Sequence, residues 1–256
     1  MKQIIQYLNS GEVEVVNVPK PIIDKSKILI STSNSLVSSG TEKMLLEFGK
    51  SNIISKAIKQ PEKAKEVLNK ITRDGFFSTY DTVINKLKKP IAVGYCNVGK
   101  VEFSSFSQFN SGDRVVSNGP HAEYFNASKN LCAHVPDSVN DETASFTVLA
   151  SVGLQGVRLV KPTLGETVVV LGLGLIGLLT VQILIANGNN VIGIDTNEDR
   201  LKLARGYGAF TINGKKNSEI IDLCLEKTNG FGVDAVVITA ATKSNSPITL
   251  SPKICR

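Results

Sequence analysis

The stretch that decides the fold is LGLGLIGLLTVQILIANGNNVIGID, residues 171–195. It is an apolar run with glycines at one end, and it closes on a single acid, Asp195. Two structures fit such a run. One is a membrane span, because residues 168–186 carry no formal charge over nearly the length that crosses a bilayer. The other is the diphosphate-binding turn of a dinucleotide site.

The order of elements around the glycines favours the dinucleotide site. A β-strand is expected to end at Leu171, the glycines fall as G-x-G-x-x-G, a helix follows, and a second strand ends at Asp195. Gly172 permits the tight turn, Gly174 lets a diphosphate approach the backbone, and Gly177 lets the helix pack closely on the strand. The polar residues Thr180, Gln182 and Asn187 also argue against a membrane span.

Asp195 favours NAD over NADP. Its carboxylate can accept hydrogen bonds from the adenosine ribose hydroxyls, it would repel a 2′-phosphate, and no arginine follows it directly. The helix N-terminus offers free N–H groups to the phosphates. We expect contacts to NAD from Gly172, Gly174, Leu175, Ile176, Gly177, Asp195 and Arg200.

The composition of the 256 residues is that of an ordinary soluble globular protein, with 42% hydrophobic and 20% charged residues. Residues 1–10 lack the apolar segment of a signal peptide, so a cytoplasmic location is expected. The net charge of +6 comes from residues 43–90, which hold 11 Lys/Arg and 5 Asp/Glu. They carry no RNA-binding signature, so we expect no nucleic-acid partner and, with the span rejected, no membrane partner.

The four cysteines lie far apart without a C-x-x-C pair, which fits neither a disulfide framework nor a zinc knuckle. We expect reduced thiols that are mostly buried. Cys96 lies in the inferred cleft region, but it has no activating base near it in sequence, so we interpret it as a small buried apolar residue.

The chain divides into two predicted domains. Residues 1–40 and 91–139 alternate short β-branched runs with turns, which predicts antiparallel strands, and residues 43–90 read as a helical insertion. A helix is predicted over 141–159, with Asn140 or Asp141 as its N-cap. From Gly165 strands and helices alternate, which predicts a parallel sheet. The domains are 1–138 and 139–256.

The chain resembles the medium-chain dehydrogenase/reductase family. The resemblance rests on Asp113-Arg114-Val115, His121-Ala122-Glu123-Tyr124, Val135-Pro136-Asp137 and GLGLIGLLTVQ. It implies a GroES-like barrel domain with a helical insertion, followed by a Rossmann domain. More narrowly, VSSGTEKMLLEFGKSN, PIAVGYCNVGKV and SNGPHAEY are similar to the N-terminal module of bacterial bi-domain oxidoreductases. That similarity implies a fused or docked Gfo/Idh/MocA-type dehydrogenase domain.

The sequence departs from the family's zinc-dependent members. Ser39-Gly40-Thr41-Glu42 stands where they have C-G-[ST]-D, and Gly94-Tyr95-Cys96 stands where they have G-H-E. Residues 149–155 offer no third ligand, and the cysteines of a structural zinc site are absent. Because serine and tyrosine are poor zinc ligands, no metal is expected.

Without a metal, hydrogen bonding or acid/base chemistry must polarise the substrate oxygen. Thr41 matches the hydroxyl that relays a proton in the zinc members, and Tyr95 places a phenol where a ligand would lie. The alternative is that Thr41 caps a turn and Tyr95 packs in the barrel. For the two imidazoles, His121 and His134, a structural role is the first interpretation, and His121 is the better candidate for catalysis.

The sequence stops before a complete Rossmann sheet. Such a sheet has the strand order 3-2-1-4-5-6, and residues 234–239 are expected as strand 4. We therefore expect an incomplete Rossmann domain, truncated after strand 4 and belonging to a fragment with impaired catalysis. Strand 4 would present an exposed apolar edge, VVIT.

The leading functional hypothesis is a zinc-independent, NAD-dependent oxidoreductase. It would transfer hydride to or from a small-molecule substrate, which the resemblance implies is a polyol, sugar or sugar-derived alcohol. The second hypothesis is a non-catalytic nucleotide-binding or scaffold module, in which the barrel and helical insertion serve as a docking surface.

Overall fold

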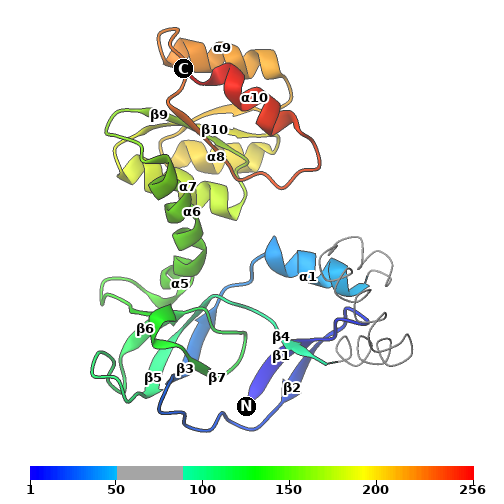
Figure 1. The fold of residues 1–256 in the computed structure, drawn as a ribbon, viewed down its shortest axis with the longest axis vertical. Coiled ribbons are helices and arrows are strands. Elements are labelled where there is room, and N and C mark those ends of the chain that lie inside the picture. The colour runs from blue at the N-terminus through cyan, green and yellow to red at the C-terminus, as the bar shows by residue number, and fades with distance from the viewer. Residues whose placement is uncertain (51–88) are drawn as a thin grey trace, which may run out of the picture. The chain divides into compact units, whose positions relative to one another are not determined.

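The computed structural model describes residues 1–50 and 89–256, which form two compact units, Met1–Val148 and Leu149–Arg256 (Figure 1). The helical insertion expected over 43–90 falls largely outside the described residues. Its beginning is helical, because α1 runs from Thr41 to Lys50.

Unit 1 contains two antiparallel sheets, as the alternating patterns predict. The smaller has the order β2-β1-β4, with β1 Lys2–Gln6, β2 Val13–Asn17 and β4 Ile91–Ala92. The larger has the order β7-β3-β5-β6-β8. Its strands are β3 Ile28–Ser35, β5 Asn97–Phe103, β6 Arg114–Ser117, β7 Tyr124–Ala127 and β8 Cys132–His134, and the short 3₁₀ helix η1, Lys129–Leu131, precedes β8.

The segment leading into β7 joins the two sheets. Gln3 and Ala122 form an isolated antiparallel bridge, and Ile4 N–H donates to the carbonyl of His121 at 2.8 Å. His121 N–H donates to the carbonyl of Val93, next to β4, at 2.7 Å. The backbone of His121 is therefore fixed from both sides before its side chain makes any contact.

The end of unit 1 differs from the sequence prediction. The helix expected over 141–159 is two helices, α5 Asp141–Ala144 and α6 Thr147–Val160. Phe146 N–H bonds to the carbonyl of Thr143, only three residues back, which tightens the turn and ends α5. Asn140 is the N-cap, because its side chain accepts from Thr143 N–H at 2.7 Å.

The units divide after Val148, later than the division expected at residue 138. The reason is that α5 is held by unit 1. Asp141 accepts a hydrogen bond from the Ser33 hydroxyl and two from the Arg114 guanidinium. These contacts keep the start of the predicted second domain on the first.

Unit 2 is built on a four-stranded parallel sheet with the order β11-β10-β9-β12, the first four strands of the predicted order. The strands are β9 Thr167–Leu171, β10 Asn190–Asp195, β11 Phe210–Asn213 and β12 Ala235–Ile238. The helices between and after them are α7 Leu175–Ala186, α8 Glu198–Gly206, α9 Asn217–Lys227 and α10 Ser246–Ile254.

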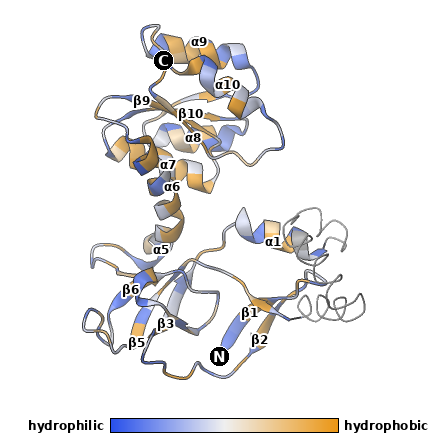
Figure 2. Ribbon diagram, in the orientation of Figure 1, coloured by the Kyte–Doolittle hydropathy of each residue, from blue (hydrophilic) through white to orange (hydrophobic). Residues whose placement is uncertain are grey.

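The central strand β9 explains the apolar run before the glycines. All five of its residues are buried, because both faces of the sheet are covered. Val168 and Val170 pack with residues of α7 and α8, whereas Val169 and Leu171 pack with residues of α9 and α10. Figure 2 shows hydrophobic and hydrophilic residues side by side on α9, as expected for a helix with one face on the sheet.

β12 is an edge strand of the described sheet, and a bridge beside it lies before its first residue, outside the predicted apolar edge VVIT at residues 236–239. Val233 N–H donates to the Ile254 carbonyl at 2.8 Å, and Arg256 N–H donates to the Val233 carbonyl at 3.1 Å. Val233 and Cys255 thereby form a parallel bridge. Ile238, at the other end of β12, is 42% exposed.

The membrane alternative for the apolar run is also wrong. Residues 168–186 are divided between β9 and the 12-residue helix α7. No helix in the described ranges, 1–50 and 89–256, combines the length and the hydropathy that a bilayer crossing requires. Within the same ranges no disulfide is present. Cys96 and Cys224 are buried, and Cys132 and Cys255 are partly exposed.

Candidate functional site

The glycine turn after β9 has the geometry that its spacing predicts. Gly172 has a φ of +100°, which favours glycine, and a Cβ there would lie 2.6 Å from Ala240 Cα. A Cβ on Gly177 would lie 2.0 Å from the carbonyl oxygen of Gly172, so only glycine lets α7 approach β9 this closely. Gly174 differs, because its φ is −68° and a Cβ there would meet nothing within 4 Å.

The N-terminus of α7 has the features of an anion site. No side chain caps it, although helix N-termini commonly use one. The N–H groups of its first turn, which includes Leu175 and Ile176, have no partners within the helix, and the helix dipole adds partial positive charge. The open space over Gly174 lies at the same end of the helix. These features fit the diphosphate of a dinucleotide.

Asp195 lies beside this turn, at the end of β10. Its Oδ2 accepts from Leu173 N–H at 2.7 Å, and its Oδ1 accepts from Asn197 N–H at 2.9 Å. Arg200 Nη1 lies 3.4 Å from Oδ2. Burial alone would raise the pKa of Asp195. The hydrogen bonds from Asn197 and Leu173, together with Arg200, outweigh burial and hold the pKa below its ordinary value. Asp195 is therefore ionised at neutral pH.

Thr41 and Tyr95 lie together in unit 1, as their proposed common role requires. The phenol of Tyr95 donates to Thr41 Oγ1 at 3.2 Å. Thr41 is the first residue of α1 and is exposed, and Tyr95 is half-buried in the loop between β4 and β5. Two hydroxyl groups are thus paired at an accessible position.

His121 is buried and is bonded at both ring nitrogens. Its Nε2 lies 3.1 Å from Glu42 Oε2, and its Nδ1 lies 2.8 Å from Ser35 Oγ. The side chain of Glu42 is 8% exposed, whereas Ser35 is exposed. Sequence reasoning nominated His121 but missed Ser35 and Glu42. No local sequence pattern connects these residues, because Ser35 lies 86 positions and Glu42 79 positions from His121.

His134 has a structural environment, in agreement with its first interpretation. Its ring stacks on Phe109 with centroids 4.9 Å apart, and its Nε2 lies 2.8 Å from the carbonyl oxygen of Gln108. Neither contact places it near Thr41, Tyr95 or His121.

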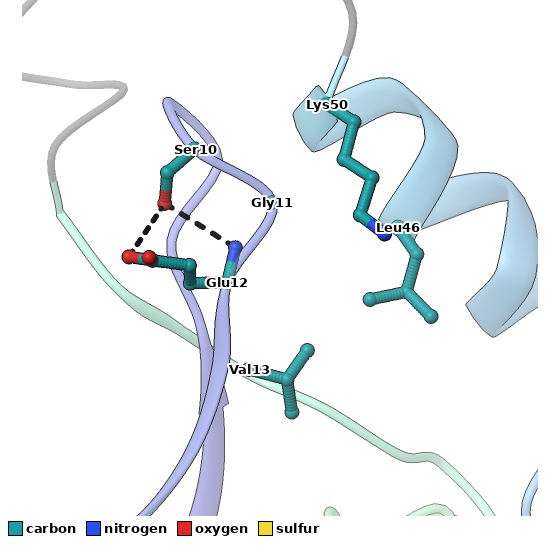
Figure 3. A pocket seen from close by; sticks show the side chains of 6 residues that line it. All are labelled: Ser10, Gly11, Glu12, Val13, Leu46 and Lys50. Atoms are coloured by element: carbon teal, nitrogen blue, oxygen red, sulfur yellow. Dashed lines mark hydrogen bonds between the residues drawn. The ribbon is translucent and has the colours of Figure 1, made fainter.

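A shallow pocket at the turn between β1 and β2 contains none of the predicted site residues. Ser10, Gly11, Glu12, Val13, Leu46 and Lys50 line it (Figure 3). The Ser10 hydroxyl bonds to the Glu12 carboxylate and accepts from Glu12 N–H, so the polar groups of this turn are satisfied by one another.

Comparison with known proteins agrees with this geometry. Residues 176–252 match the family model described as zinc-binding dehydrogenase. An alcohol dehydrogenase of Moraxella sp. (strain TAE123) is 33% identical over 156 residues, which is 60% of this chain and 45% of that protein. The similarity to that family is thus shown over residues 176–252 of this chain.

A second relative and a solved structure extend this finding. The NADP-dependent isopropanol dehydrogenase of Clostridium beijerinckii is 31% identical over 124 residues, 47% of this chain and 35% of the relative. This chain therefore spans less than half of the length of both relatives. Galactitol-1-phosphate dehydrogenase from Escherichia coli has the same fold, with a TM-score of 0.75, 17% identity, and coverage of 100% of this chain and 72% of the other.

The donor groups do not fit the zinc ion that the family name implies. In the part of the chain that the structure describes, no three His, Cys, Asp or Glu side chains are grouped so that they could hold a metal. Tyr95 bonds to Thr41, and His121 is engaged by Glu42 and Ser35.

Proposed function

We propose that this chain is the cofactor-binding and substrate-binding part of a zinc-independent, NAD-linked oxidoreductase that acts on alcohols. Within that class, the sequence resemblance favours a polyol, a sugar or a sugar-derived alcohol. A fused or docked Gfo/Idh/MocA-type domain remains a prediction from the same resemblance.

The observation that carries this proposal is the uncapped N-terminus of α7 beside Asp195. Gly174 leaves space for a diphosphate, the first turn of α7 offers N–H donors, and Asp195 places a carboxylate next to the turn. A structural glycine turn would explain Gly172 and Gly177. It would not explain why the space over Gly174 is open and why no side chain caps the helix.

The ionised carboxylate of Asp195 supports NAD rather than NADP. A ribose 2′-hydroxyl can donate a hydrogen bond to it, whereas a 2′-phosphate would bring a second negative charge to the same place. Arg200 is the counter-argument, because a guanidinium also pairs well with phosphate. The name of the Clostridium beijerinckii relative shows that NADP dependence occurs among similar proteins, so the choice needs a direct test.

A bound nicotinamide supplies the hydride chemistry, and the residues of the chain bind and orient the substrate. Thr41 and Tyr95 can both hydrogen-bond to the substrate oxygen. Such bonds polarise a carbonyl, or favour loss of the hydroxyl proton, without a Lewis acid. Their mutual bond of 3.2 Å holds the two hydroxyls next to each other before substrate arrives.

Titration of the purified chain with NADH and NADPH tests the proposal, with nicotinamide fluorescence and calorimetry as readouts. We expect NADH to bind more tightly than NADPH, and we expect D195A to remove this preference. D222A, at an exposed acid of α9, is the matched control and should change neither affinity. Absence of binding by both cofactors would refute the proposal, and tighter binding of NADPH would refute its choice of NAD.

A further inference from the structure

Ser35, His121 and Glu42 form a hydrogen-bonded chain that runs from an exposed hydroxyl to a buried carboxylate. Ser35 is the last residue of β3, His121 precedes β7, and Glu42 lies in the first turn of α1. His121 is 6% exposed and Glu42 is 6% exposed, so water has little access to the inner end.

Bonding around Glu42 determines the proton positions in the chain. Its Oε1 accepts from Ser38 N–H at 2.8 Å, and its Oε2 faces His121 Nε2. An ionised carboxylate only accepts, so with Glu42 ionised this hydrogen bond assigns a hydrogen to His121 Nε2. In the neutral imidazole Nδ1 is then an acceptor, and it can receive the hydrogen of the Ser35 hydroxyl at 2.8 Å. A hydroxyl, an imidazole and an acid in this order resemble the arrangement that activates hydroxyl groups in enzymes.

The hydrogen-bonded chain of Ser35, His121 and Glu42 involves the same two segments that carry Thr41 and Tyr95. Glu42 directly follows Thr41 in α1. Gly94 directly precedes Tyr95, and its backbone lies so close to the imidazole that a Cβ would be 2.7 Å from His121 Cδ2. We call the hydrogen-bonded chain of Ser35, His121 and Glu42 the relay. Because Thr41 and Tyr95 bond to each other, the segments that carry them also hold the relay in place.

We propose that Ser35 is a catalytic residue that exchanges a proton with the substrate oxygen, with His121 and Glu42 as the positioning residues behind it. This inference rests on the proposed function. It deepens that function by naming a proton path that uses neither a metal nor the cofactor.

In alcohol oxidation, the substrate O–H bond breaks and its proton goes to Ser35 Oγ, while the proton of Ser35 moves to Nδ1 of His121. A bound oxidised nicotinamide would take the hydride released when the substrate C–H bond breaks, so that the substrate carbon would be oxidised and the cofactor reduced. The imidazolium that forms is stabilised by the Glu42 carboxylate, and it later releases its proton to water through Ser35. Reduction of a carbonyl follows the same steps in reverse.

The test compares S35A with S35T in the full chain, using NAD-linked oxidation of a panel of primary, secondary and polyol alcohols between pH 6 and 9. The NADH dissociation constant and the melting temperature are measured on the same samples. Ser35 is exposed at the end of a strand, so both variants should fold. General acid/base catalysis contributes about 10²–10⁴-fold, so kcat should fall at least about a hundredfold in S35A.

S35T keeps the hydroxyl and should retain kcat to within about tenfold.

The outcomes separate the relay from the proposed function. Unchanged kcat in S35A, with NADH bound, would overturn the relay alone. If the wild type binds NADH but oxidises no alcohol of the panel, the proposed reaction is wrong and the relay is overturned with it. If the wild type binds no NADH, the cofactor assignment itself has failed.

Discussion

The space over Gly174 yields the most direct prediction. In Gly174→Ala the new methyl group would occupy the place where a diphosphate meets the α7 N-terminus. The backbone angles of −68° and −172° suit alanine, and nothing lies within 4 Å, so the fold should tolerate the change. A smaller unfolded-state entropy should even stabilise the protein by about 0.4–1 kcal/mol.

Binding should respond in the opposite direction. A displaced phosphate loses at least one hydrogen bond to a charged acceptor, which is worth about 1.5–3 kcal/mol. We therefore expect NADH affinity to fall on the order of tenfold to a hundredfold, while the melting temperature stays equal or rises. Calorimetric titration and thermal unfolding of the same sample measure the two effects.

Gly206→Ala is the matched control. Gly206 ends α8, is exposed, and also has open space where a Cβ would lie. The control should gain similar stability and bind NADH as the wild type does. If Gly174→Ala binds NADH with unchanged affinity, the diphosphate does not lie at this turn, and the reasoning from the open space is refuted.

Three further predictions concern packing, acid stability and catalysis. In Gly177→Ala the Cβ would lie 2.0 Å from a carbonyl oxygen, so we expect a loss of about 1–3 kcal/mol in denaturant unfolding of unit 2; a midpoint equal to that of the wild type would contradict this. The Ser33 hydrogen bond and Arg114 lower the pKa of Asp141, so its ionised form stabilises the protein above the unfolded pKa of about 3.9, and this stabilisation is lost as pH falls through the lower folded pKa. Asp141→Asn should therefore destabilise the protein at pH 7, and its difference from the wild type should shrink as the pH falls through the folded pKa, as urea midpoints over a series of decreasing pH would show. Tyr95→Phe should lower kcat and leave NADH binding intact, and an unchanged kcat would return Tyr95 to a packing role.

The sequence predicted the conformation of the glycine turn after β9 because each of its residues has a local reason. Gly172 needs a positive φ, Gly177 needs close packing, and Asp195 closes the next strand at the expected distance. All three follow from spacing along a single strand–helix–strand unit. The strand order of unit 2 follows from the same regularity.

Other features depend on contacts that spacing does not encode. The relay joins β3, α1 and the lead-in to β7, so it exists only once the strand pairing of unit 1 has been set. The pair of Thr41 and Tyr95 spans 54 positions, and only a family resemblance suggested that the two residues act together. The later unit boundary likewise depends on distant contacts, those of Asp141 with Arg114 and Ser33.

The pairing of Arg256 with the start of β12 bears on the order in which the protein is made. Arg256 Nη2 lies 2.6 Å from Asp234 and 3.9 Å from Glu166, and its backbone bonds to Val233. These partners are synthesised well before residue 256 leaves the ribosome. A nascent chain emerges in sequence order, so the segment leading into β12 lacks these contacts until Arg256 has emerged. During that interval this strand edge is open to pairing with other chains.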